Sequence, residues 1–161
     1  MLPTAMEQQK FRKEERLRSK RAIDDLFRNG SSFILYPYRV VYRRLPATLS
    51  GGRASLVRIL FSVPKRRFHK AVDRNLLKRR MREAYRLQKG PWLETISANS
   101  DQRKVLHPDD NSKLYGFTSL DVAVQYIASE KLDFSILHSK MADVLSKLRN
   151  EYGKVYLGED H

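Results

Sequence analysis

Apolar positions in residues 20–30 follow a helical repeat. Ile23, Leu26 and Phe27 stand at i, i+3 and i+4, which places them on one side of a helix. The segment ends in Asn-Gly, a pair that favours the left-handed conformation in which many helices stop. The pattern therefore predicts a short amphipathic helix with a left-handed glycine stop.

Two later segments have the composition of strands. Residues 38–45 read YRVVYRRL and residues 54–63 read ASLVRILFSV, on either side of the loop-like sequence PATLSGGR. We expect two antiparallel strands here. The preceding Tyr-Pro-Tyr at residues 36–38 is compatible with a strand start or with stacking area for a ligand. In the second strand, alternate positions form a core-facing set: Ser55, Val57, Ile59, Phe61 and Val63.

The C-terminal part predicts one more strand and one more helix. Residues 119–128 read SLDVAVQYIA, a strand-like sequence, and residues 91–117 before it are polar and predict an inserted loop. Residues 133–153 predict a helix with Asp133 as a candidate N-cap. Its apolar positions recur at helical spacing: Leu137, Met141, Val144, Leu145, Leu148 and Tyr152.

Residues 68–89 predict an amphipathic helix that is unusually basic. Lys89-Gly90-Pro91 predicts its end. Leu76, Leu77, Met81, Ala84 and Leu87 form the apolar side, which Arg80 interrupts. The opposite side carries Arg74, Asn75, Lys78, Arg79, Arg82, Arg86 and Lys89.

Composition adds a polyanion as the expected partner. The chain has 161 residues, the size of one domain, and a net charge of +14 with a pI near 10.2. Such a charge predicts attraction to nucleic acid first and to an anionic membrane surface second. The absence of Cys excludes disulfides and thiolate metal sites and fits a reducing cytoplasm. We expect no membrane span and no secretory signal.

The positive charge is concentrated in the first half of the chain. Residues 65–89 hold eleven Lys and Arg against two acids, whereas residues 90–161 carry a net charge of about −3. Residues 10–28 add eight Lys and Arg against four acids. Polyanion binding is therefore expected to involve the N-terminal half.

The basic side of the predicted helix opposes its own formation. Arg74, Lys78 and Arg82 are like charges at i, i+4 spacing, which cost a few tenths of a kcal/mol per pair. A solvated face is the ordinary interpretation of a charged stripe, but that face usually mixes Lys with Glu. Arg forks onto phosphate and stacks on bases, so the stripe favours RNA or DNA over lipid.

Residues 61–86, FSVPKRRFHKAVDRNLLKRRMREAYR, resemble the signature of the bacterial ribonuclease P protein family. The match covers Ala71, Val72, Arg74, Asn75, Lys78, Arg79, Arg82 and Glu83. Pro64 departs from the small residue that is common in the family. The resemblance extends over about residues 12–152 of a single domain spanning residues 1–161, with the insertion at about 91–117 longer than usual.

The resemblance implies a fold and an activity. The family fold is an α+β single-domain sandwich of the ribosomal-protein-S5-domain-2 type, with a left-handed βαβ crossover. The family's protein binds a catalytic RNA that removes the 5′ leader of precursor tRNA with Mg²⁺ bound mainly by the RNA. We therefore expect an enzyme subunit without catalytic residues of its own, acting in the cytoplasm with no membrane or DNA partner. The neighbouring Asp109 and Asp110 lie in the polar insertion, where solvated side chains are expected.

The resemblance also implies two binding surfaces. The catalytic RNA is expected to contact Lys65, Arg66, Arg67, Arg74, Asn75, Lys78, Arg79 and Arg82. The single-stranded leader is expected in a cleft between the first helix and the sheet, at Ile23, Phe27 and Tyr42. A core role for Ile23 and Phe27, which stand at i, i+4 of an amphipathic helix, remains the alternative.

Other classes of protein share part of this pattern. A structural RNA-binding protein, such as a ribosomal one, would show the same charge and sandwich, and an autonomous nuclease is a further alternative. The order of elements disfavours a helix-turn-helix transcription factor. The four His residues are scattered along the sequence and predict no metal site.

Overall fold

The computed structural model describes residues 10–45, 56–106 and 119–156, with side chains through residue 96 in the second range and residue 151 in the third. The predicted positions Ala54 and Ser55, and the side chain of Tyr152, lie outside this part of the chain. The elements are η1 (Lys13–Glu15), α2 (Lys20–Asn29), β1 (Ser31–Leu35), β2 (Tyr38–Leu45), β3 (Val57–Ser62), α4 (Ala71–Leu106), β4 (Ser119–Tyr126) and α5 (Phe134–Tyr156).

The strands form one sheet in the order β1-β2-β4-β3. β2 pairs antiparallel with β1 and β4, and β3 pairs parallel with β4. The two strands predicted from residues 38–45 and 54–63 thus run antiparallel, but β4 lies between them. The mixed α+β fold is as expected, and α4 makes the crossover of a βαβ unit.

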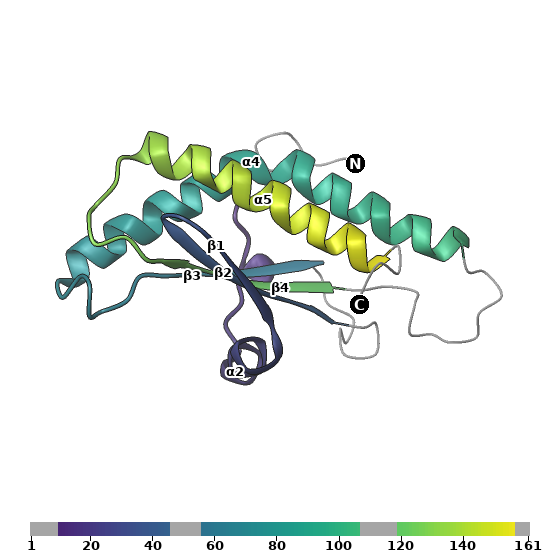
Figure 1. The fold of residues 1–161 in the computed structure, drawn as a ribbon, viewed down its shortest axis with the longest axis horizontal. Helices are drawn as coiled ribbons and strands as arrows, with labels where there is room; N and C mark the ends of the chain where they lie inside the picture. Colours follow the sequence, from purple (N-terminus) through teal and green to yellow (C-terminus); the bar gives the residue numbers. More distant parts are fainter. Residues whose placement is uncertain (1–9, 46–55, 107–118, 157–161) are drawn as a thin grey trace.

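The helices cover both faces of the sheet. Figure 1 shows α4 and α5 on one face and α2 on the other. The larger core lies beneath α4 and α5, where Val57, Ile59 and Phe61 of β3 are buried, so the predicted core-facing set is confirmed for these positions. A smaller cluster beneath α2 contains Leu26 and Val41.

The first hairpin was incompletely predicted. β1 was missed because its polar Ser31-Ser32 start hides the strand pattern, although Phe33 packs against the larger core. A turn with a cis Tyr36–Pro37 peptide joins β1 to β2. The sequence did not distinguish a strand start from stacking area for a ligand at Tyr36-Pro37-Tyr38. The structure places Tyr38 at the start of β2, and its hydroxyl donates to the Leu137 carbonyl at 2.9 Å.

The predicted left-handed stop of α2 is wrong. Gly30 is extended, with φ −80° and ψ 161°. A Cβ at this position would lie 2.4 Å from the Leu26 carbonyl oxygen and 2.9 Å from the Tyr42 carbonyl oxygen. Glycine is required here by close approach of the backbone and not by a positive φ.

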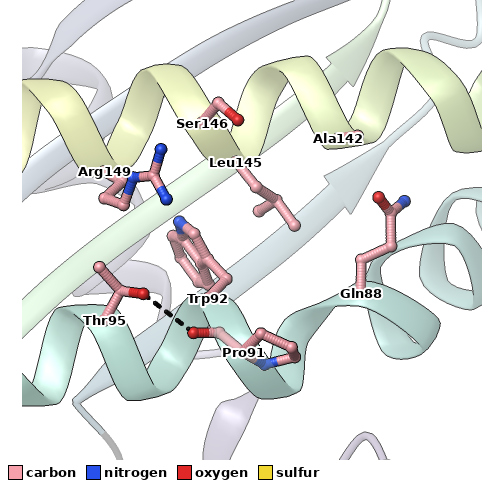
Figure 2. Close-up of a pocket in the computed structure, with 8 residues that line it drawn as sticks. All are labelled: Gln88, Pro91, Trp92, Thr95, Ala142, Leu145, Ser146 and Arg149. Atoms are coloured by element: carbon pink, nitrogen blue, oxygen red, sulfur yellow. Dashed lines mark hydrogen bonds between the residues drawn. The ribbon is translucent and has the colours of Figure 1, made fainter.

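The predicted stop of the basic helix at Gly90-Pro91 is also wrong. α4 continues to Leu106, so the first part of the predicted insertion is helical, and residues 107–118 lie outside the described chain. Trp92 and Ile96 are buried in the larger core, which stabilises the helix beyond a proline that removes one hydrogen bond. Figure 2 shows Trp92 directed toward α5 and the Thr95 hydroxyl donating to the Pro91 carbonyl at 3.0 Å.

The strand and helix predicted in the C-terminal part are confirmed. β4 pairs with both neighbours, and α5 buries every predicted apolar position for which the side chain is described. The Asp133 carbonyl accepts from the Ile136 and Leu137 amides at 3.1 Å, as expected for the residue that precedes a helix.

Candidate nucleic-acid interface

The buried side of α4 determines which of its cations face outward. Leu77, Met81, Ala84 and Tyr85 are fully buried against the sheet and α5. Leu76 is only half-buried and Leu87 is 42% exposed, so the predicted apolar side is narrower than expected. Arg80, which interrupts that side, donates to the Leu132 carbonyl at 2.9 Å.

Most of the predicted RNA-binding residues present free polar groups. Lys78 is half-buried, whereas Asn75, Arg79 and Arg82 are exposed. Lys65, Arg66 and Arg67 are exposed in the turn that precedes α4. Within the described ranges, none of these cations forms an ion pair. We call this set the α4 stripe: Lys65, Arg66, Arg67, Asn75, Lys78, Arg79 and Arg82.

Arg74 has a second role that the sequence did not reveal. Its Nη1 donates to the carbonyls of Phe68 and His69, at 2.8 Å each. The guanidinium therefore braces the turn that leads into α4. A substitution of Arg74 would disturb this turn as well as any contact with RNA.

The acids of this region are already neutralised by cations outside the stripe. Asp73 pairs with Lys131 at 3.1 Å, and Glu83 pairs with Arg86 at 2.6 Å. The hydrogen bond from Arg86 lowers the pKa of Glu83 below its usual value. The stripe therefore keeps its positive charge. The helical pattern placed Arg86 on the same side, but its guanidinium is paired with Glu83.

Lys89 does not belong to the exposed face. Its side chain is 2% exposed, and its Nζ lies 2.6 Å from Glu15 Oε1. The periodicity of a single helix could not reveal this because residues 10–15, from a distant part of the chain, cover this turn of α4. The prediction that placed Lys89 among the outward cations is wrong.

The three predicted leader-binding residues do not lie together. Ile23 is half-buried in the smaller cluster beneath α2, and Phe27 is 40% exposed one turn further along. Tyr42 points to the opposite face, where its ring lies 5.9 Å from that of Phe33 and its hydroxyl lies 3.4 Å from Glu151 Oε2. Burial, together with Glu151, raises the pKa of Tyr42. Placing Tyr42 in a cleft with Ile23 is therefore corrected, whereas a role for Ile23 and Phe27 remains a prediction.

Among the described residues, pockets lie on two sides of α4. One, between α4 and α5, is lined by Trp92, Thr95 and Arg149 among others, and Figure 2 shows these side chains. The other lies between α4, β3 and the segment before α2, and Arg16 and Arg18 contribute to it beside Lys78 and Arg82. Sequence reasoning did not single out Arg16 or Arg18, although the excess of Lys and Arg in residues 10–28 was a signal.

The described residues contain no group of three or more His, Asp or Glu side chains arranged to hold a metal ion. No described helix is long and apolar enough to cross a bilayer. The exposed Lys and Arg side chains of this surface can bind phosphates, and its aromatic side chains can stack on bases.

The sequence and the fold both resemble proteins of the ribonuclease P family. The ribonuclease P family pattern matches residues 11–149. The ribonuclease P protein component of Porphyromonas gingivalis is 48% identical over 113 residues, which cover 70% of this chain and 80% of that protein. The ribonuclease P protein component of Chlorobium phaeobacteroides is 29% identical over 141 residues, covering 86% and 88% of the two chains.

Two solved structures of RNase P proteins resemble this fold. The RNase P protein from Thermotoga maritima has a TM-score of 0.55 and 25% identity, covering 83% of this chain and 96% of that one. The RNase P protein of Staphylococcus aureus has a TM-score of 0.52 at 16% identity and covers 83% and 94% of the chains, a likeness in fold.

Proposed function

This chain belongs to the ribonuclease P protein family, and we propose that it binds the catalytic RNA and the 5′ leader of precursor tRNA. In this role it assists the endonucleolytic removal of the leader that gives the mature tRNA 5′ end. Its partners are then the RNA subunit and precursor tRNA, in the cytoplasm, with no membrane or DNA partner.

The observation that carries the proposal is the unneutralised α4 stripe. The buried Leu77 and Met81 fix one side of α4 against the core, so Lys78, Arg79 and Arg82 all project from the other side. Nearby Asp73 and Glu83 pair with Lys131 and Arg86 instead. A fixed row of free Lys and Arg gains affinity by releasing the counterions that condense on a nucleic acid.

The stripe orients the protein on RNA and reduces the repulsion between two negatively charged RNAs. Phosphate contacts fix the register of a protein on its nucleic acid without reading sequence. Because the described carboxylates form no group of three, we propose that Mg²⁺ is held mainly by the RNA partner and supports phosphodiester hydrolysis there. The protein itself then supplies binding and not the hydrolytic groups.

For the leader we propose a surface around Phe27. Phe27 is 40% exposed on α2, near the half-buried Ile23. An exposed aromatic ring stacks on unpaired bases with little dependence on sequence. A mature tRNA lacks the leader, so this contact would favour precursor over product.

Cleavage of precursor tRNA at low Mg²⁺ tests the proposal. The protein alone is expected to leave the precursor uncut, and the catalytic RNA with the protein is expected to release the leader faster than the RNA alone. A protein that does not change the rate of the RNA would favour a purely structural RNA-binding role. Cleavage by the protein without RNA would favour an autonomous nuclease.

A further inference from the structure

The pocket between β3, α4 and residues 10–18 is lined by cations and aromatic rings. We call residues 10–18 the N-terminal strap. The pocket has a volume of about 260 Å³, and every charged side chain that lines it is positive. The residues that matter for its chemistry are Phe11, Arg16, Arg18, Phe61, Lys78 and Arg82.

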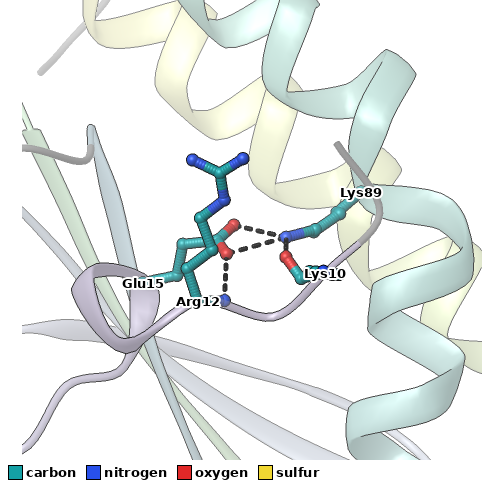
Figure 3. A network of polar contacts seen from close by, with 4 residues as sticks. All are labelled: Lys10, Arg12, Glu15 and Lys89. Carbon is teal, nitrogen blue, oxygen red and sulfur yellow. Dashed lines mark hydrogen bonds and ion pairs between the residues drawn. The ribbon is translucent and has the colours of Figure 1, made fainter. Parts of the chain in front are cut away.

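The strap is anchored at both ends. Figure 3 shows Lys89 Nζ facing both carboxylate oxygens of Glu15 and the Lys10 carbonyl oxygen. Nζ donates to the two Glu15 oxygens at 2.6 and 2.7 Å. The Arg12 amide donates to the same carboxylate at 2.6 Å. At the other end, the Leu17 amide donates to the Ile59 carbonyl of β3 at 3.1 Å. The wall of the pocket is therefore fixed before any ligand binds.

The strap carries a stacking surface into the pocket. The Phe11 ring packs against the rings of Phe61 and Tyr85, with centroids 6.0 and 5.7 Å away. The exposed Arg16 places its guanidinium carbon 5.4 Å from the centre of the Phe11 ring. A guanidinium supported by a ring is a planar group on which an unpaired base can stack.

We propose that this pocket binds one unpaired nucleotide of the RNA partner. In this arrangement the base packs on Arg16 above Phe11, and the phosphates contact Arg18, Lys78 and Arg82. This inference rests on the proposed function, because Lys78 and Arg82 belong to both the pocket and the α4 stripe. The pocket lies just below the usual size of ligand pockets, so it accepts one nucleotide and not the side of a duplex.

The chemistry of the walls favours RNA over other anionic partners. A phosphate ion alone would use the cations but not the supported guanidinium plane. A nucleotide uses both, and a single strand can extend from the pocket along the stripe without leaving a positively charged surface. Unpaired bases are also the parts of a folded RNA that proteins reach most readily.

The substitution Arg16→Lys separates stacking from charge. Lys keeps the positive charge but lacks the planar group, so the dependence of affinity on salt should be unchanged. Affinity of the protein for the catalytic RNA should fall by about 2- to 30-fold, the range expected when a cation–π contact of a guanidinium is lost. Arg149→Lys, an exposed position on α5, is the matched control and should change neither quantity.

Competition with short oligonucleotides identifies the nucleotide as unpaired. A single-stranded oligouridylate should displace the wild-type protein from the catalytic RNA more effectively than a duplex of equal length, and Arg16→Lys should reduce this difference. If Arg16→Lys binds like wild type and the competitors are equivalent, the pocket inference fails while RNA binding by the stripe stands. If the wild-type protein does not bind the catalytic RNA at all, the proposed function fails.

Discussion

Lys89 Nζ lies 2.6 Å from Glu15 Oε1, and the two side chains are 2% and 10% exposed. This ion pair joins the N-terminal strap to the middle of α4. Removing one partner of a buried pair leaves the other charge without compensation, which typically costs about 3 to 5 kcal/mol.

Lys89→Ala is therefore expected to lower the free energy of unfolding by about that amount. Arg79→Ala, on the exposed side of the same helix, should change it by less than about 0.5 kcal/mol. The double variant Glu15→Leu with Lys89→Met should recover most of the loss, since an apolar pair leaves no buried charge. Chemical denaturation of the four proteins measures these differences. Equal stability of Lys89→Ala and Arg79→Ala would contradict the buried pair.

Phe27 and Tyr42 are expected to behave differently toward the leader. Phe27→Ala removes an exposed ring and should weaken binding of precursor tRNA to the reconstituted complex by about 5- to 150-fold, with mature tRNA unaffected. Tyr42→Leu removes the aromatic ring that packs against Phe33 on the opposite face of the sheet and should leave both affinities of the folded complex unchanged. A selective loss of precursor binding in Tyr42→Leu would show that Tyr42 contacts the leader.

Two glycines give a matched pair for stability. Gly30→Ala would force a Cβ against two backbone carbonyls, so we expect a loss of about 1 to 3 kcal/mol in the free energy of unfolding. A Cβ at Gly90 would meet no heavy atom within 4 Å apart from its chain neighbours and the backbone of its own helix. Gly90→Ala should therefore be neutral or stabilising by at most about 1 kcal/mol, with Pro91 limiting the gain. Thermal unfolding of both variants shows which one loses more stability. A larger loss in Gly90→Ala than in Gly30→Ala would contradict this prediction.

Trp92 should stabilise the fold through its ring and not through its N–H. Trp92 is 6% exposed, and its Nε1 has no hydrogen-bond partner in the described part of the chain. Trp92→Phe removes an unpaired buried donor while keeping an aromatic ring, so we expect a change within about 1 kcal/mol. Trp92→Ala should cost about 3 to 5 kcal/mol. If Trp92→Phe were as damaging as Trp92→Ala, the indole nitrogen would need a partner.

Periodicity predicted the elements better than it predicted their ends. The spacing of Leu77 and Met81 placed the core side of α4 correctly, because burial against a sheet is a property of one helix face. Pro91 suggested a stop because a proline removes a hydrogen bond, yet burial of Trp92 in the core outweighs that local cost. Long-range packing of this kind leaves little trace in a local pattern.

In the candidate site too, features set by one helix face were predicted, whereas features set by long-range packing were not. The helical cations of the α4 stripe, Lys78, Arg79 and Arg82, were predictable because they lie on one face of one helix. Lys89 and Tyr42 were misplaced because their surroundings come from Glu15 and Glu151, which are distant in sequence. Arg16 was missed because Phe11, the ring beneath its guanidinium, is positioned by Phe61 and Tyr85, which are distant in sequence.

The affinity of the protein for the catalytic RNA as a function of salt tests the role of the α4 stripe most directly. Affinity falls as salt rises, and each phosphate contact adds about one unit to the magnitude of the negative slope of log affinity against log salt concentration. Arg79→Ala should weaken binding and reduce this magnitude by about one unit. Arg86→Ala, which removes a cation already paired with Glu83, should reduce the magnitude less. An unchanged slope in Arg79→Ala would contradict the account and make the stripe an ordinary solvated face.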